Sequence, residues 1–247
     1  MKKYNVSFII MNRIFKMKQC LVLFSGGIDS TTALFWALNE YEKTFALTFD
    51  YGQRHSIEIL MAQKIAKKHN VPQKILYLNL RQIGGSSLTD DKLPLPHFEN
   101  VNEISGGPPS TYVPFRNGIF LAVAAAWAEV EGIKDIICGF NVIDSPNYPD
   151  TQESFAKAME KAINLGTKAS ISNENLKILA PFCKMKKAEI IKIGLALRAD
   201  YSYSISCYSG EEIPCLKCSS CLLRQNAWGE IGLSDPLILR LKKEGKI

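Results

Sequence analysis

A glycine turn followed by hydroxyl residues is the first stretch of this sequence that could do chemistry. Ser25 to Thr32 reads Ser-Gly-Gly-Ile-Asp-Ser-Thr-Thr and lies between an apolar run and a helical pattern. Two glycines let a backbone turn tightly toward a ligand, and the unpaired N–H groups of a helix start favour an anion. The pattern is neither a Walker loop nor a dinucleotide fingerprint. It predicts a phosphate site; the alternative is a plain turn in which Asp29 caps the helix.

Four cysteines near the C-terminal end form a second candidate site. They are spaced C-x7-C-x2-C-x2-C and are Cys207, Cys215, Cys218 and Cys221. Four thiolates at this spacing suit a closed tetrahedral site that holds one structural zinc ion per chain, beside a helix expected over 222–231. An iron–sulfur cluster would use similar ligands and stays open as the alternative.

The elements that must position these two sites alternate between strand and helix. Apolar runs predict strands at 20–24, 44–49, 75–80, 136–140 and 178–180. Helical patterns lie between and after them at 30–41, 57–69, 117–131, 155–165 and 187–197. This alternation predicts an α/β fold with a doubly wound, Rossmann-like parallel sheet, because right-handed crossovers place helices on both faces. Ligands bind such sheets at the carboxyl ends of the strands, where the phosphate loop lies.

Length and charge set the domain organisation. The chain has 247 residues, of which 47% are hydrophobic and 22% charged, so disorder is excluded and one main domain is expected. The net charge is +6, and four of these charges lie in the first sixteen residues without an acid, which leaves +2 for a chain that starts at Met17. We therefore expect an extension over 1–16 from an upstream start, a main domain over 17–200 and a zinc-binding region over 201–247.

Two further segments carry expectations of their own. The connection over 81–112 is rich in Gly, Ser, Pro and Asp, and a connection this long predicts a lid or mobile segment that is poorly ordered without ligand. The basic stretch over 240–246 is interpreted as a solvated tail. No stretch reaches the roughly 20 apolar residues of a membrane span. The chain is therefore expected in the cytoplasm, where thiols stay reduced and a cysteine cluster indicates a metal.

The phosphate loop carries a resemblance to a known family. Ser-Gly-Gly-x-Asp-Ser resembles the pyrophosphate loop of the ATP-pyrophosphatase (PP-loop) superfamily, whose fold is of the adenine nucleotide alpha hydrolase-like type. Within it, the chain is similar to the 7-cyano-7-deazaguanine synthase family of the queuosine pathway from about residue 19 to about residue 228. The matching stretches are Phe24 to Thr32, Asp50 to His55, Val113 to Asn117, Gly139 to Asp150, Leu165 to Thr167, Lys187 to Ile190 and Ser206 to Cys221.

This resemblance implies a carbon–nitrogen ligase. It would convert 7-carboxy-7-deazaguanine and ammonia to 7-cyano-7-deazaguanine with ATP, through an adenylated carboxylate and an amide. ATP would bind on Phe24, Ser25, Gly26, Gly27, Ile28, Asp29, Ser30, Thr31, Thr32, Ala33 and Leu34, with Mg²⁺ held beside Asp29. The residues expected to take part in catalysis are Asp29, Ser30, Arg54 and Lys187. The residues expected to contact the substrate are Arg116, Asn117, Asn141, Asp144 and Asp150.

Several of these residues have a simpler interpretation. Arg54 and His55 follow the second strand and would meet phosphate charge; the alternative is a polar loop in which His55 caps the next helix. Asn117 opens the third helix, so it is as much a candidate cap as a ligand contact. The stretch 141–150 offers acceptors for the N–H edge of a purine-like ring, and its prolines also favour a turn. Lys187 is either near a phosphate or part of a solvated basic helix start.

Two other functions stay open. A PP-loop tRNA sulfurtransferase would need a reactive cysteine in the cleft, and Cys138 and Cys183 are the candidates, although both are also interpreted as buried apolar residues. A zinc-containing nucleic-acid-binding protein is disfavoured, because the basic excess lies mainly in 1–16, so no stable nucleic-acid partner is expected. Free ammonia is the expected nitrogen source, since only 24 residues precede the loop. The resemblance also implies a homodimer, and whether ATP ends as AMP or ADP is open.

Overall fold

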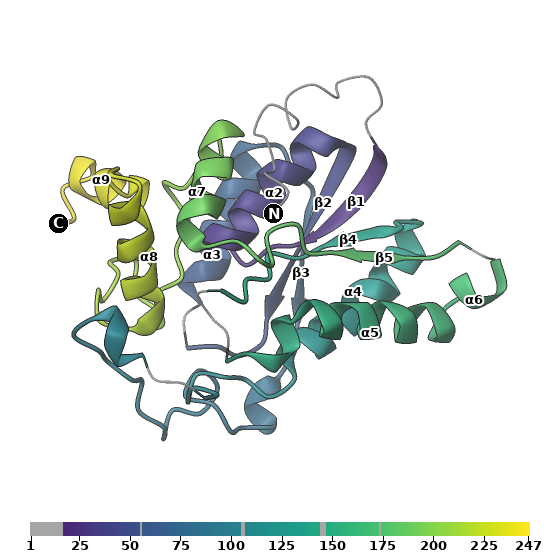
Figure 1. Ribbon diagram of the computed structural model, residues 1–247, viewed down its shortest axis with the longest axis horizontal. Coiled ribbons are helices and arrows are strands. Elements are labelled where there is room, and N and C mark those ends of the chain that lie inside the picture. Colours follow the sequence, from purple (N-terminus) through teal and green to yellow (C-terminus); the bar gives the residue numbers. More distant parts are fainter. Residues whose placement is uncertain (1–16, 55, 105–106, 144–146, 173) are drawn as a thin grey trace.

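A five-stranded parallel sheet forms the centre of the protein. The computed structural model describes residues 17–54, 56–104, 107–143, 147–172 and 174–247. The strands are β1 (Met17–Leu23), β2 (Tyr41–Asp50), β3 (Gln73–Tyr77), β4 (Asp135–Ile137) and β5 (Lys177–Leu179). Their order is β3-β2-β1-β4-β5 and every pairing is parallel (Figure 1). The predicted doubly wound sheet is confirmed, whereas the expected extension over 1–16 lies outside the described residues.

Helices cover both faces of this sheet. The bounds are α2 (Ile28–Glu40), α3 (Ile57–Lys68), α4 (Arg116–Glu131), α5 (Glu153–Gly166), α6 (Ala169–Ser172), α7 (Lys187–Ala196), α8 (Ser219–Glu230) and α9 (Pro236–Lys243). Neighbouring strand residues point to opposite faces, as the two-residue repeat requires. Leu21 and Ile136 therefore pack with α4 and α5, whereas Val22 and Ile137 pack with α2, α3 and α7.

The strand order places a crevice at the phosphate loop. The chain runs outward from β1 through β2 to β3, and then returns to the other side of β1 to form β4. This reversal leaves an open crevice at the carboxyl ends of β1 and β4, which is where doubly wound folds bind their ligands. The phosphate loop follows β1 directly and therefore lies in this crevice.

The connection over 81–112 packs against the domain, apart from residues 105–106, which lie outside the description. Ser86, Ser87 and Leu88 are buried, and Leu88 accepts a hydrogen bond from the Arg54 backbone N–H at 3.2 Å. Two short 3-10 helices, η1 (Leu80–Gln82) and η2 (Val101–Glu103), interrupt it. The described part is thus not the poorly ordered connection that its composition predicted. It runs beside the carboxyl ends of the strands toward α8 (Figure 1).

The basic C-terminal stretch begins inside helix α9, which ends at Lys243, whereas residues 242–247 are exposed, so the predicted tail over 240–246 is only partly correct. Asp235 caps α9 by accepting a hydrogen bond from the Leu237 N–H, and Pro236 occupies the first helical turn. Both are common helix-start signals. Leu237 and Leu241 lie four residues apart and are fully buried, which fixes the helix against the domain. Arg224 of α8 also pairs with Asp235, at 2.5 and 2.8 Å.

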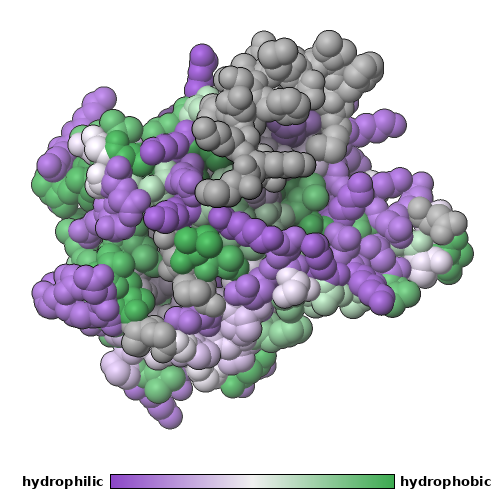
Figure 2. Space-filling view, viewed as in Figure 1, coloured by the Kyte–Doolittle hydropathy of each residue, from purple (hydrophilic) through white to green (hydrophobic). Residues whose placement is uncertain are grey.

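Hydrophilic side chains are spread widely over the face of the molecule in Figure 2. In the part of the chain that the structure describes, no helix is long and apolar enough to cross a membrane.

Gly194 of α7 provides a test of the packing behind the phosphate loop. A Cβ atom there would lie 1.7 Å from the Tyr201 hydroxyl, which is hydrogen-bonded to Thr32 Oγ1 at 2.6 Å. We expect Gly194→Ala to destabilise the fold by about 2 to 3 kcal/mol, because overpacking forces buried groups apart. Gly229→Ala on α8 is the control, since its Cβ would meet no atom within 4 Å and alanine favours a helix. Equal urea midpoints for the two variants would contradict this packing.

Candidate functional site

The phosphate loop has an open helix start. Gly27 is the N-cap of α2 and no side chain caps this helix, so Asp29 is not the cap that the simpler interpretation requires. Gly26 has φ +86°, a conformation that favours glycine, and an added Cβ would lie 3.2 Å from Ala62. The Ser25 and Ser30 hydroxyls lie 3.1 Å apart beside the turn. Backbone N–H groups and hydroxyls therefore surround a space that suits an anion.

An ion pair joins the loop to a distant helix. Lys187 Nζ donates to Asp29 Oδ2 at 2.6 Å, and both side chains are largely buried. Lys187 is the first residue of α7, and the Lys186 backbone N–H at the start of this helix donates to Glu189 Oε2 at 2.8 Å. Lys187 therefore lies at the phosphate loop rather than in a solvated helix start, and its contact with a phosphate stays a prediction. The other carboxylate oxygen of Asp29, Oδ1, is buried without a hydrogen-bond partner in the described structure.

Gly139 supports the loop from behind. It follows β4, and a Cβ atom there would lie 2.8 Å from the Asp29 carbonyl carbon and from the Ser30 N–H nitrogen. Only glycine permits this close approach of two backbones. The expected strand over 136–140 ends at Ile137, and the residues after it form part of the cleft wall.

A cleft extends from the loop and contains a second polar group. Its empty volume is about 1500 Å³, part of which is open to solvent. Ser25, Gly27, Asp29, Ser30 and Lys187 line it around the phosphate loop. The second group of lining residues consists of Tyr51, Thr111, Arg116, Asn117, Tyr148 and Tyr208. Their side chains combine one cation with several hydroxyl groups, which suits a polar, ring-shaped ligand.

The start of α4 positions Arg116 and Asn117. Phe115, the N-cap residue, has φ 54°, a left-handed conformation that is uncommon outside glycine. The Asn117 N–H donates to Asp150 Oδ2 at 2.9 Å. A remote carboxylate therefore satisfies this helix start, and the interpretation of Asn117 as the cap is wrong. Asp150 is buried and is not among the described cleft-lining residues, so its carboxylate holds the helix rather than facing the cleft.

Asn141 lines the cleft, but its amide also fixes the turn after β4. Its Nδ2 donates to the Met185 carbonyl at 3.0 Å, and its Oδ1 accepts from the Ile143 N–H at 3.0 Å. The turn interpretation of this stretch is thus supported for Asn141. Asp144, the third expected acceptor, lies outside the described residues.

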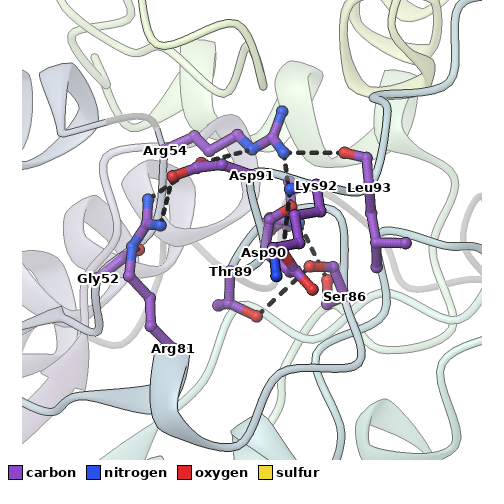
Figure 3. Close-up of polar contacts among 10 residues, drawn as sticks. Gly52, Arg54, Arg81, Ser86, Thr89, Asp90, Asp91, Lys92 and Leu93 are labelled. Atoms are coloured by element: carbon purple, nitrogen blue, oxygen red, sulfur yellow. Dashed lines mark hydrogen bonds and ion pairs between the residues drawn. The ribbon is translucent and has the colours of Figure 1, made fainter.

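Arg54 is directed to the 81–112 connection rather than to the phosphate loop. Its Nη2 donates to the Asp90 and Leu93 carbonyls at 2.5 and 2.8 Å, and its Nε lies 3.1 Å from Asp91 Oδ1 (Figure 3). Arg81 also pairs with Asp91, at 2.7 Å. The Arg54 guanidinium therefore binds backbone carbonyls and a carboxylate. This placement disagrees with the expectation that Arg54 meets phosphate charge. His55 lies outside the described residues.

The four cysteines meet at one point and can hold a metal ion. Cys207, Cys215, Cys218 and Cys221 bring their Sγ atoms within 4.8 Å of one another. The Cys215 and Cys221 sulfurs are 4.0 Å apart, close to the edge of about 3.8 Å that four bonds of about 2.3 Å give in a tetrahedral zinc site. The Cys215 N–H donates to Cys207 Sγ at 3.2 Å, and such bonds favour a thiolate.

This cysteine cluster adjoins the cleft, which the sequence analysis did not anticipate. Ser206 and Tyr208, on either side of Cys207, line the cleft. The Ile205 N–H donates to the Gly26 carbonyl of the phosphate loop at 3.1 Å. Tyr51, Tyr148 and Tyr208 are therefore candidate site residues that sequence reasoning missed. Each lies within one of the stretches that carry the family resemblance, and that position was the available signal.

The fold and site define an α/β protein with a phosphate loop, a substrate-sized cleft and a four-cysteine group. A family model described as Queuosine biosynthesis protein QueC matches residues 19–232. The chain therefore belongs to this family of queuosine biosynthesis proteins.

Curated relatives cover nearly the same length. The chain is 44% identical over 220 residues to the 7-cyano-7-deazaguanine synthase of Thermoplasma volcanium, spanning 89% of this chain and 90% of that one. It is 41% identical over 222 residues to the enzyme of the same name from Stutzerimonas stutzeri, spanning 89% and 97%. Among solved structures, the U34-tRNA thiolase of Methanococcus maripaludis gives a TM-score of 0.46 and 16% identity over 93% of this chain and 68% of that chain.

Proposed function

We propose that this chain converts 7-carboxy-7-deazaguanine and ammonia to 7-cyano-7-deazaguanine with ATP. Its membership of the queuosine biosynthesis family and the names of its relatives support the reaction. The single structural observation that carries it is the Asp29–Lys187 pair, which joins the phosphate loop to α7 on the wall of one cleft. This arrangement suits a reaction in which pyrophosphate leaves from ATP.

The chemistry takes two rounds of one step. The substrate carboxylate attacks the α-phosphate of ATP, the bond to the β-phosphate breaks, and pyrophosphate leaves on the loop. Ammonia then displaces AMP, which carries away one carboxylate oxygen, and gives the amide. The amide oxygen attacks a second ATP in the same way, and loss of AMP and of the nitrogen-bound protons gives the nitrile. Rate enhancement arises from positioning and from stabilisation of the departing phosphates.

Several groups in and around the phosphate loop have a part in this proposal. The N–H groups at the start of α2 and the Ser30 hydroxyl bind the phosphates. Lys187 neutralises the charge on pyrophosphate as it leaves. Asp29 would hold Mg²⁺ through Oδ1, the buried oxygen without a hydrogen-bond partner in the described structure, and the ion would supply charge stabilisation to the phosphates.

We propose zinc for the four-cysteine group, which would serve as a structural ion. Four thiols in a closed, mostly buried arrangement fit zinc, and no fifth ligand is needed. The zinc-binding region over 201–247 would then complete the cleft wall of the main domain over 17–200. We further propose a cytoplasmic homodimer without a stable nucleic-acid partner.

The thiolation alternative receives no support from the cysteines that it requires. Cys138 and Cys183 are both buried, and burial raises the pKa of each thiol above its ordinary value. A persulfide-forming cysteine needs an accessible thiolate instead. We therefore expect a protein with alanine at both positions to keep full nitrile-forming activity, as measured by mass spectrometry of the products.

Product analysis tests this function. Purified protein receives 7-carboxy-7-deazaguanine, nitrogen-15 ammonium, Mg²⁺ and ATP, and mass spectrometry follows the products. We expect an amide and then a nitrile, each with one nitrogen-15 atom. If protein that holds its metal and binds ATP forms neither product, the proposed reaction is wrong.

A further inference from the structure

Arg116 is a half-buried cation on the cleft wall with spare hydrogen-bonding capacity. Its Nη1 donates to the Tyr51 hydroxyl at 3.2 Å, and its Cζ lies 5.6 Å from the Tyr51 ring and 5.9 Å from the Phe120 ring. These contacts orient the guanidinium plane. Its Nε is buried and, among the described residues, has no hydrogen-bond partner.

The other cations of the cleft wall are paired with carboxylates. Arg116, Lys187 and Arg224 are the cations among the described lining residues. Lys187 pairs with Asp29, and Arg224 pairs with Asp235. In the part of the chain that the structure describes, no ion pair joins Arg116 to a carboxylate. The Asp150 carboxylate, which accepts from the Asn117 N–H, attracts the guanidinium from a longer distance. A partly buried guanidinium without a direct counter-ion has a desolvation cost, so an anionic ligand would stabilise it.

The hydroxyl groups beside Arg116 can complete an anion receptor. Tyr51 accepts its hydrogen bond from Arg116 and keeps its own proton to donate elsewhere. Burial raises the pKa of Tyr51, so its phenol stays protonated at neutral pH. Thr111 and Tyr148 share a hydrogen bond of 3.1 Å at the same part of the cleft. In the described structure, no hydrogen bond or ion pair joins Arg116 to the phosphate loop.

We infer that Arg116, with the Tyr51 hydroxyl, binds the carboxylate of the substrate and selects for the acid over the amide. This inference rests on the proposed function and deepens it. A guanidinium holds a carboxylate with two parallel charge-assisted hydrogen bonds, and the neutral amide of the second round offers only one oxygen acceptor. Arg116 therefore serves the acid-to-amide half of the reaction more than the amide-to-nitrile half.

The test compares the two half-reactions in Arg116 variants. Steady-state kinetics start from the acid or from the corresponding amide, and calorimetry measures ATP binding. We expect Arg116→Gln to raise KM for the acid about 100-fold and for the amide less than about 10-fold, with the Kd for ATP unchanged. Arg116→Lys keeps the positive charge but not the two parallel N–H donors of the guanidinium, so it should recover part of the affinity for the acid.

A packing variant distinguishes recognition of the substrate carboxylate by Arg116 from a purely structural role of this side chain. Phe120→Leu loosens the ring beside the guanidinium without changing its charge, so it should shift KM for the acid and the amide by the same factor. An equal shift for both substrates in Arg116→Gln would make Arg116 merely structural and overturn the inference. Weakened ATP binding with an unchanged acid-to-amide ratio would mean that a phosphate is the anion, which also overturns it. If the parent protein forms nitrile from neither compound, the proposed function fails instead.

Discussion

Replacing Asp29 with asparagine is expected to lower the rate of nitrile formation by about 100- to 1,000-fold while the fold stays intact. Asp29 lies at the start of α2, accepts from Lys187 through Oδ2 and has a buried Oδ1 without a hydrogen-bond partner in the described structure. Asparagine keeps the size of the side chain but removes the charge that would hold Mg²⁺ against the phosphates. Single-turnover rates with saturating ATP measure the loss, and thermal unfolding checks the fold.

Two further variants exclude simpler explanations for this loss. If Asp29 only neutralised Lys187, then Asp29→Asn combined with Lys187→Met would recover activity, because both charges of the pair would be gone. We expect no recovery, since each residue acts on the phosphates. Glu174→Gln removes an exposed carboxylate that pairs with Lys134 and should leave the rate unchanged. A rate for Asp29→Asn within about threefold of the parent would contradict the role of Asp29.

Replacing Cys215 with serine is expected to release the metal and to lower the melting temperature by at least about 10 °C. Structural zinc contributes about 10 to 16 kcal/mol in small zinc domains, and about 1 kcal/mol shifts the melting temperature of a chain of this size by about 2 to 4 °C. The buried Leu237 and Leu241 pack around the same cysteines, so α9 should unfold with the site. Metal analysis and calorimetric melting measure both effects.

The cysteine cluster should also influence nucleotide binding. The Ile205 N–H holds the Gly26 carbonyl, and Ser206 and Tyr208 line the cleft beside Cys207. We therefore expect Cys215→Ser to weaken ATP binding as well as folding. Cys183→Ser is the matched control, because Cys183 is a buried cysteine outside the cluster whose Sγ donates to the Thr151 carbonyl, as a hydroxyl can. A Cys215→Ser protein that keeps one equivalent of metal and its melting temperature would contradict the structural role.

The sheet and the clustering of the four cysteines were predictable because their signals are local. A continuous apolar run followed by a glycine turn and a helical pattern specifies strand, loop and helix wherever it occurs. The cysteine spacing likewise specifies a tetrahedral group without knowledge of the rest of the fold. The structure confirms both kinds of feature in the parallel sheet and in the clustered sulfurs.

The directions of long polar side chains were not predictable, because distant backbone groups determine them. Arg54 reaches carbonyls 36 and 39 residues further along the chain, and Asp150 reaches an N–H 33 residues earlier. No sequence pattern marks the carbonyls that accept from Arg54 or the N–H that donates to Asp150. Helix α9 could have been predicted, because Asp235, Pro236 and the spacing of Leu237 and Leu241 are local helix signals. The run of basic residues over 240–246 was instead interpreted as a tail.

The path of the carboxylate oxygens tests the central claim most directly. The substrate acid is labelled with oxygen-18 in both carboxyl oxygens, and mass spectrometry follows the nucleotide and phosphate products of nitrile formation. Two rounds of adenylation on the phosphate loop predict two AMP molecules per nitrile, each with one oxygen-18 atom in its phosphate, and unlabelled pyrophosphate. Oxygen-18 in inorganic phosphate or in water would contradict adenylation.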